Sequence, residues 1–215
     1  MNAVLANLPE FLEGFRVTLL LLVISGIGAL VIGTIVAAMR ISPIRSLNVF
    51  AAVYTELLRN TPLTLVLLFC ALILPYLGLT LPYFVCAVVG LTLYTSPFVA
   101  EALRSGINGV PIGQAEAARS LGLGFSQSVG LIIFPQAFRM VIPPLINVMI
   151  ALTKNTSVAS GFFVVELIGV GKNLANLNGN AVIAILLAVA VFYLVITIPL
   201  GILSQRLEKK LVVLR

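Results

Sequence analysis

Two groups of charged and polar residues at the borders of apolar runs are the positions where this sequence could bind a polar molecule. The first group comprises Glu56, Arg59, Asn60 and Thr61, and the second comprises Lys154, Asn155, Thr156 and Ser157. Together they supply cations with several hydrogen-bond donors for a carboxylate, and an acceptor for an ammonium group. Charges beside long apolar runs are costly and usually face a cavity or a partner, so both groups are candidate positions on a polar path.

A purely structural interpretation of the same charges stays open. Glu56 and Arg59 are three residues apart, share one face of a helix, and can pair with each other near a membrane boundary. Lys154 can extend its ammonium group toward lipid headgroups as an anchor at a helix end.

The sequence offers no clear set of residues for covalent or metal chemistry. It contains no histidine, and Cys70 and Cys86 lie within apolar runs without a second cysteine at metal-ligand spacing, which indicates packing. Only the end of a phosphate-binding loop is matched, by Gly171-Lys172-Asn173. That motif needs a glycine five residues before Gly171, where Glu166 stands, and Ser or Thr after the lysine. We therefore expect no catalytic residue, no metal and no nucleotide site in this chain.

The composition is that of a membrane protein. Of the 215 residues, 60% are hydrophobic and 9% are charged, whereas soluble domains contain about 25% charged residues. The mean hydropathy of +1.18 arises from long apolar runs separated by short polar breaks. The net charge of +6 comes from Lys and Arg at the ends of these runs, where they indicate topology rather than a nucleic-acid patch. We predict an all-α membrane protein whose residues 1–215 form a single domain in contact with lipid.

Five apolar runs are long enough to predict transmembrane helices: residues 17–38, 62–79, 81–100, 129–151 and 181–204. The first reaches ~33 Å at ~1.5 Å per residue, enough for a hydrocarbon core of ~30 Å. Helix breakers between the second and third runs predict a tight hairpin, and prolines within the fourth predict a bend. Residues 161–171 are too few to span, and we expect a re-entrant or surface element there.

Small side chains recur every fourth residue in the first run, at Ser25, Ala29, Gly33 and Ala37. This spacing places them along one face of a helix, and a face of small side chains lets a second helix approach closely. We expect a packing interface there.

The distribution of positive charge predicts the orientation in the membrane. With the N-terminus outside, eight Lys and Arg residues fall on the inner side and three on the outer side. The inner set is Arg40, Arg45, Arg104, Arg119, Arg206, Lys209, Lys210 and Arg215, and the outer set is Arg16, Lys154 and Lys172. Since cytoplasmic loops carry the excess of positive charge, the N-terminus is expected outside, and the C-terminus and the polar segment 101–128 inside.

Within the polar segment 101–128, which we expect to form one cytoplasmic loop, the residues from Gln114 onward predict a helix-turn-helix elbow. Alanines favour a short helix, Glu116 and Arg119 can pair across one turn, and Gly122 can end the helix in the left-handed conformation. Ser126 can cap a second helix that runs on through Pro135. Such an elbow could be a simple polar connector, or it could dock into a partner subunit.

The elbow resembles the EAA loop of binding-protein-dependent ABC importer permeases. The resemblance rests on Glu116-Ala117-Ala118, on Gly122 six residues after the glutamate, and on Ile132 and Pro135. The chain departs from the general pattern at Arg139, where the family often has a second proline. This variant, Phe134-Pro-Gln-Ala-Phe-Arg139, is similar to the polar amino acid branch, as are Arg59-Asn-Thr-Pro-Leu63 and Ala151-Leu-Thr-Lys-Asn-Thr-Ser157.

The resemblance implies a permease subunit of the plasma or inner membrane that moves a polar amino acid, with glutamate or glutamine favoured, by alternating access. It implies three partners: a cytoplasmic ABC ATPase dimer that binds ATP and Mg, an extracytoplasmic amino-acid-binding protein, and a second permease subunit, identical or related. The ATPase-coupling residues that it implies are Glu116, Ala117, Ala118, Arg119, Leu121, Gly122 and Pro135.

Two other classes fit the sequence less well. A secondary transporter or channel usually carries titratable residues deep in the membrane, but this chain has no Asp or His, and none of its seven Glu lies in the middle of a long apolar run. A scaffold protein without transport activity would not need an ordered elbow.

Overall fold

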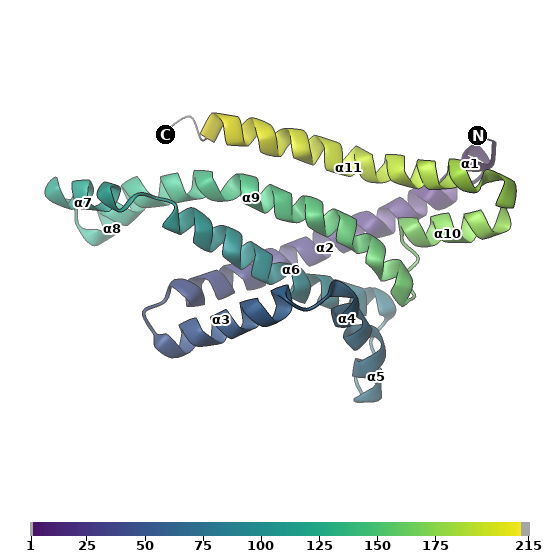
Figure 1. Cartoon of the computed structure of the whole chain (residues 1–215), viewed down its shortest axis with the longest axis horizontal. Helices are drawn as coiled ribbons and strands as arrows, with labels where there is room; N and C mark the ends of the chain where they lie inside the picture. The colour runs from purple at the N-terminus through teal and green to yellow at the C-terminus, as the bar shows by residue number, and fades with distance from the viewer. Residues whose placement is uncertain (1, 212–215) are drawn as a thin grey trace.

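The computed structural model describes residues 2–211, and every regular element in that range is helical. The elements are α1 (Asn2–Ala6), α2 (Leu8–Ile41), α3 (Arg45–Arg59), α4 (Leu63–Leu68), the π-helix η1 (Phe69–Ile73), α5 (Leu74–Tyr76), α6 (Tyr83–Asn108), α7 (Ile112–Ser120), α8 (Phe125–Gln127), the π-helix η2 (Ser128–Ile133), α9 (Phe134–Asn155), the 3₁₀-helix η3 (Thr156–Phe162), α10 (Leu167–Leu177), the 3₁₀-helix η4 (Gly179–Ala181) and α11 (Val182–Leu211). Figure 1 shows an elongated bundle in which α2, α6, α9 and α11 run along the long axis. The all-α prediction is confirmed.

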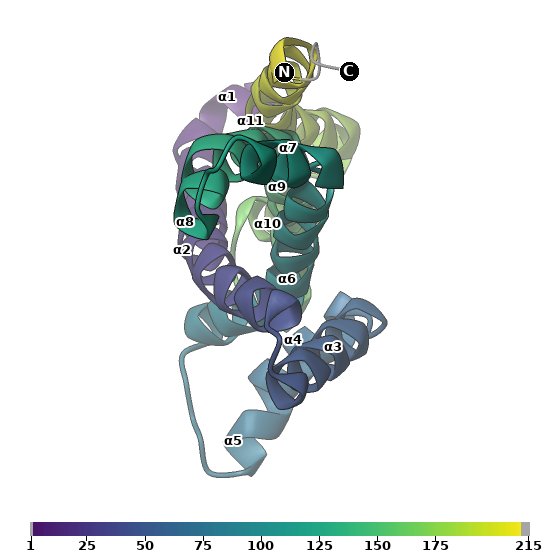
Figure 2. The ribbon, with the colours of Figure 1, turned by 90° about the vertical axis from the view of Figure 1, so that its left-hand side faces the viewer.

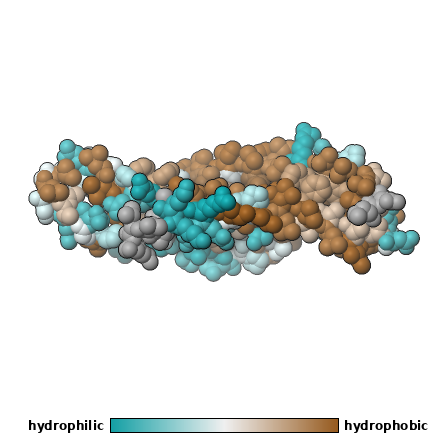
Figure 3. Space-filling view, turned by 90° about the horizontal axis from the view of Figure 1, so that it is seen from above, coloured by the Kyte–Doolittle hydropathy of each residue, from teal (hydrophilic) through white to brown (hydrophobic). Residues whose placement is uncertain are grey.

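Four helical stretches are long and apolar enough to cross a membrane: Leu8–Ile41, Tyr83–Asn108, Phe125–Phe162 and Gly179–Lys210. They contain four of the five runs that the sequence predicted as spans. The outward face of α11 is apolar along most of its length, from Ile183 to Leu203. Figure 3, seen from above, shows this brown face giving way to teal toward the C-terminal end. A lipid-facing band therefore covers the middle of the molecule.

The run predicted as a span over residues 62–79 forms only the second half of a bent pair of helices. The helix there, Leu63–Tyr76, is too short for a hydrocarbon core of ~30 Å, and it is bent by 100° from α3. The bend falls at Pro62, which has no N–H to donate and which disfavours a helical conformation in the residue before it. α3 and α4–α5 together are long and apolar enough to count as a fifth span only if this bent pair is taken as one broken span. The turn expected before the next helix is present, with Gly78 at a φ of +87° and α6 beginning just after Pro82.

The expected interface of small side chains forms between α2 and α6. Ser25, Ala29, Gly33 and Ala37 are all buried on α2. A Cβ atom added to Gly33 would lie 2.6 Å from Val99 side-chain atoms and 2.7 Å from the Ser96 carbonyl oxygen. The two backbones approach each other as closely as a glycine permits, and the packing prediction is confirmed.

Residues 161–171 do not span, as expected. The chain leaves η3 through Phe163, which adopts the left-handed conformation at a φ of 63°, and then enters α10. This helix has 11 residues and packs between α2 and α11. It lies at the end of the bundle where the N-terminus lies (Figure 1).

The opposite end of the bundle carries the elbow, defined here as residues 112–127. α7 ends at Ser120. Gly122, two residues later, has a φ of +79°, and the Leu123 N–H donates to the Ala118 carbonyl as in a standard C-terminal helix cap. Figure 2 views the molecule from this end, with α7 and α8 nearest the viewer. The short helix and its firm stop are confirmed.

Two details of the polar segment 101–128 differ from expectation. Residues 101–108 continue α6, and the Arg104 guanidinium pairs with the Glu101 carboxylate on the surface of this helix. Ser126 is not the cap of the second helix. That helix begins one residue before Ser126, and the Gln127 side chain instead accepts a hydrogen bond from the Gly124 N–H at 3.0 Å.

The close approach at Gly33 leads to a stability prediction. Gly33→Ala should lower the free energy of unfolding by about 1–3 kcal/mol, because the added methyl group forces α2 away from α6. Gly201→Ala, on α11, meets no atom within 4 Å and should be neutral or slightly stabilising. Thermal unfolding of the detergent-purified variants measures both, and equal melting temperatures for the two would contradict the packing account.

Candidate functional site

A cavity of about 430 Å³ lies between α6 and α9. The lining residues on each helix are spaced three or four positions apart, which places them on one face of α6 and one face of α9. The lining residues are Tyr94, Thr95, Phe98, Asn147, Val148, Ala151, Leu152 and Asn155. Two amides and two hydroxyls thus face each other across an otherwise apolar space.

Thr95 is the lining residue whose polar group lacks a partner within the described chain. The Thr95 side chain is buried, and its Oγ1 has no hydrogen-bond partner among residues 2–211. A buried hydroxyl without a partner costs about 1–3 kcal/mol. Native proteins rarely retain such a group without a ligand, a water or a functional reason.

Asn147 is held in place from outside the cavity. The Ser204 hydroxyl of α11 lies 3.2 Å from Asn147 Oδ1 and 3.4 Å from the Pro143 carbonyl oxygen, and it can donate to either. With Oδ1 accepting from Ser204, the amide NH₂ group of Asn147 is the end left to donate to a ligand. α11 therefore orients a polar group of the cavity without lining it.

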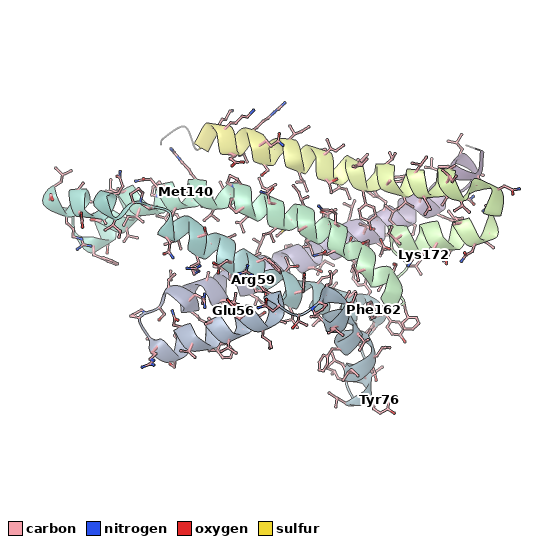
Figure 4. The ribbon with its side chains drawn as sticks, viewed as in Figure 1. Glu56, Arg59, Tyr76, Met140, Phe162 and Lys172 are labelled. Carbon is pink, nitrogen blue, oxygen red and sulfur yellow. The ribbon has the colours of Figure 1, made fainter. Side chains whose placement is uncertain are left out.

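Arg59 contacts one of the side chains that line the cavity. Its guanidinium carbon is 5.6 Å from the centroid of the Phe98 ring, a cation–π contact with a side chain that lines the cavity. Figure 4 shows Arg59 and Glu56 on α3, beside α6. The expected pairing of the two is absent from the ion pairs of the described chain. Glu56 instead accepts a hydrogen bond from the Asn60 amide at 3.3 Å.

The second predicted group is divided by the structure. Asn155 lines the cavity, whereas Lys154 is exposed. The hydroxyls of Thr156 and Ser157 donate to backbone carbonyls one turn earlier, as does that of Thr61 in the first group. Of the two predicted groups, only Asn155 lines the cavity, and Arg59 reaches it indirectly through its contact with Phe98.

Sequence reasoning missed Tyr94, Thr95 and Asn147. Each is a polar residue inside an apolar run that was assigned as a membrane span. Polar residues within such a run are themselves a signal of an internal path. The predicted groups consist of charged residues and their polar neighbours near the borders of apolar runs, whereas these three residues lie within such runs.

The elbow exposes large apolar side chains. Ile112, Leu121 and Phe125 are 78%, 81% and 84% exposed. Glu116 and Arg119 are also exposed, and no ion pair joins them in the part of the chain that the structure describes. Ala118 is the buried member of the predicted coupling set, whereas Ala117, Gly122 and Pro135 lie on the surface. Such an apolar surface at a polar end of the protein indicates a protein partner.

A family model described as "Binding-protein-dependent transport system inner membrane component" matches residues 6–213. The chain belongs to this family. The chain is 46% identical to the glutamate transport system permease protein GluC of Corynebacterium efficiens, over 99% of each chain. It is 42% identical to the probable glutamine ABC transporter permease protein GlnM of Bacillus subtilis, over 95% of this chain and 94% of that one.

Solved structures agree with this assignment. A crystal structure of an amino acid ABC transporter with histidines superposes with a TM-score of 0.89 at 29% identity, covering 96% of both chains. A methionine ABC transporter, MetNI, in an inward-facing conformation superposes with a TM-score of 0.76 at 19% identity, covering 96% of this chain and 98% of that one. The second likeness concerns the fold alone.

These likenesses confirm the resemblance inferred from the elbow. The chain is a permease subunit of an amino-acid ABC importer. Permease subunits have no catalytic site of their own, since ATP is hydrolysed by a separate subunit, so this chain is not an enzyme. It is a multi-pass membrane protein.

The unpartnered hydroxyl at Thr95 gives a prediction about stability. Thr95→Val should raise the free energy of unfolding by about 1 kcal/mol, because it replaces a buried hydroxyl that has no partner with a methyl group. Thr55→Val is the matched control, since the buried Thr55 hydroxyl donates to the Ala51 carbonyl at 2.7 Å. Thermal unfolding in detergent without substrate should rank Thr95→Val above wild type and Thr55→Val at or below it, and the reverse order would contradict the assignment.

Proposed function

We propose that this chain carries glutamate or glutamine inward across the plasma membrane, in an importer driven by a separate ABC ATPase dimer. The observation that carries the proposal is the near-full-length identity to permeases named for glutamate and glutamine transport. ATP and Mg bind the ATPase, and an extracytoplasmic binding protein delivers the amino acid. The permease contributes the path and the conformational change.

The cavity between α6 and α9 suits an amino acid as its occupant. Thr95, Asn147 and Asn155 offer hydrogen bonds to the carboxylate, the ammonium group and the side-chain carboxylate or amide. Arg59, held over the Phe98 ring, places a positive charge where a carboxylate can approach. The walls are mostly apolar, and a few polar groups on such walls can orient a ligand.

The remaining predicted path residues fit supporting roles in this scheme. Lys154 is exposed at the outer end of α9 and can attract an anionic amino acid before it enters. Thr156 and Ser157 close the last turn of the same wall through their backbone contacts. Glu56, Asn60 and Thr61 lie beside Arg59 and surround the approach to it.

The elbow joins the two walls of the cavity. α6 is followed by α7 after a turn of three residues, 109–111, and α8 runs through η2 into α9. A displacement of the elbow by an ATPase therefore acts on α6 and α9 together. This connection supports alternating access, in which the ATP-bound ATPase and the loaded binding protein stabilise different openings of the path.

The orientation and the second subunit complete the proposal. The elbow and the basic end of α11 lie in the cytoplasm, and the N-terminus lies outside, as the distribution of Lys and Arg predicts. The arm formed by α4, η1 and α5 projects from the bundle (Figures 1 and 2). Tyr76, the last residue of this arm, is 94% exposed, and Leu77, which follows it, is 71% exposed. A second permease subunit, identical or related, is the partner that we propose to pack against this arm.

Coupling at the elbow is tested by a reversal of charge. The chain is coexpressed with its ATPase and binding protein and reconstituted in nanodiscs. ATP hydrolysis is then measured with glutamate, glutamine, arginine or histidine. Glu116→Lys should lower hydrolysis stimulated by substrate and binding protein at least tenfold, because Glu116 lies exposed on the docking helix. Glu208→Lys is the control, since it makes the same charge change at an exposed position on α11.

The outcomes of this experiment separate the alternatives. Stimulation that requires the binding protein and either glutamate or glutamine, and that is lost only in Glu116→Lys, supports both the importer and its substrate. An ATPase that neither copurifies with the wild-type chain nor responds to it would contradict the coupling assignment.

Substrate contact in the cavity is tested with the conservative variant Thr95→Val. Loss of one hydrogen bond to a bound amino acid should raise the half-saturating substrate concentration for stimulated ATP hydrolysis about five- to tenfold. Thr55→Val should leave that concentration unchanged. An unchanged value for both variants would place the substrate path elsewhere.

A further inference from the structure

A fully buried carboxylate lies outside the cavity, where the proposed function gives it no role. Glu166 has 0% exposed surface and precedes the first residue of α10. Its Oε2 accepts a hydrogen bond from the Tyr193 hydroxyl at 2.7 Å and lies 3.3 Å from the Thr18 hydroxyl. Its Oε1 accepts from the Gly169 N–H at 3.0 Å. One side chain therefore joins α10 to both α2 and α11.

Thr18 adds a second connection to the same place. Its Oγ1 accepts a hydrogen bond from the Leu167 N–H at 3.2 Å, and its hydroxyl can donate to Glu166 or to the Gly14 carbonyl. The first backbone N–H groups of α10, which have no partners within the helix, are thus bonded by side chains. We call Glu166, Thr18 and Tyr193 the anchor.

The anchor is surrounded by apolar side chains rather than by cations. The cluster where α10 packs against α2 and α11 consists of Phe11, Leu167, Val170, Leu174, Ile185 and Val189. Burial is the dominant effect on Glu166 and raises the pKa of its carboxyl above the ordinary value, although the hydrogen bonds that it accepts act in the opposite direction. A neutral group of the same shape is therefore a close substitute for this side chain.

The anchored segment is continuous with the wall of the cavity. η3 follows directly after Asn155, which lines the cavity, and packs against α2, α4, α6 and α9. The Lys172 ammonium group of α10 donates to the Ser160 hydroxyl of η3 at 3.2 Å. Figure 4 shows Phe162 and Lys172 at this end of the bundle, opposite the elbow. Residues 156–177 therefore fold back over one end of the bundle as a connected unit.

We infer that Glu166 is a positioning residue for transport: it fixes residues 156–177 to α2 and α11, and so sets the place of Asn155 in the substrate path. The inference rests on the proposed function of the cavity. Glu166 itself does not touch the substrate. Removing it releases the outer end of the α9 wall while the elbow and the packing of α2 against α6 stay intact.

The test compares two substitutions at this position in the reconstituted complex. Glu166→Ala should raise the half-saturating glutamate or glutamine concentration for stimulated ATP hydrolysis at least fivefold, with basal hydrolysis unchanged. Glu166→Gln should restore the wild-type value within twofold, because its amide replaces the carboxyl and the hydroxyls of Thr18 and Tyr193 can reverse to accept. Ile185→Ala, which opens the apolar cluster without touching the anchor, should lower the melting temperature and leave half-saturation unchanged.

Three results would overturn the inference. The half-saturating concentration could be unchanged in Glu166→Ala, it could rise in Glu166→Gln as much as in Glu166→Ala, or it could rise equally in Ile185→Ala. If Glu166→Ala does not assemble, Tyr193→Phe removes one donor and keeps the ring, and it should give at least a twofold shift. No shift in that variant would equally overturn the inference.

A second readout does not depend on transport and distinguishes failure of the anchor from failure of the proposed function. Leu174→Cys places a thiol at a 2% exposed position on α10, in a chain whose Cys70 and Cys86 are replaced by alanine. Labelling by a membrane-impermeant maleimide should be slow, become at least tenfold faster in Glu166→Ala, and stay slow in Glu166→Gln. Equal labelling rates would show that Glu166 does not hold α10, whether or not the complex transports glutamate.

Discussion

The hydrocarbon core of a bilayer contains no water, so each backbone N–H and C=O group of a spanning segment must find its partner within the protein. Long helices satisfy this requirement, and they account for α2, α6, α9 and α11. Because lipid chains are as apolar as leucine side chains, the helices are held together by close packing. The contact between α2 and α6, made through Gly33 and its small neighbours, is the frame that lets other helices carry polar groups between them.

Polar groups inside this frame occur in two kinds of place. At Glu166 the neighbouring hydroxyls and backbone N–H groups satisfy the carboxyl, and the result is a rigid connection. At Thr95 the hydroxyl has no partner within the described chain, and the space beside it is open. The first arrangement holds the bundle together, and the second leaves hydrogen-bonding capacity for a ligand. α6 and α9 enclose this space, and the elbow connects them to each other.

The sequence predicted those features of the fold that are determined by residues close together in the chain. Gly122 after a run of helix-favouring alanines predicted the elbow, and hydropathy predicted four of the spans. α3 was missed as part of a span because Arg45, Glu56 and Arg59 make it too polar, and its role appears only when α4 and α5 continue it. The cavity was missed because Thr95 and Asn147 are separated by about fifty residues in sequence, and only the packing of α6 on α9 brings them together.

We propose that this chain forms a transport path, and that ATP hydrolysis in a partner subunit drives its opening. The most direct measurement is uptake of radiolabelled glutamate and glutamine into proteoliposomes that contain the permease, its ATPase and its binding protein. We predict that uptake of one of them requires hydrolysable ATP and the binding protein, and that it persists when an ionophore removes ion gradients. Uptake that needs an ion gradient and proceeds without ATP would contradict the account.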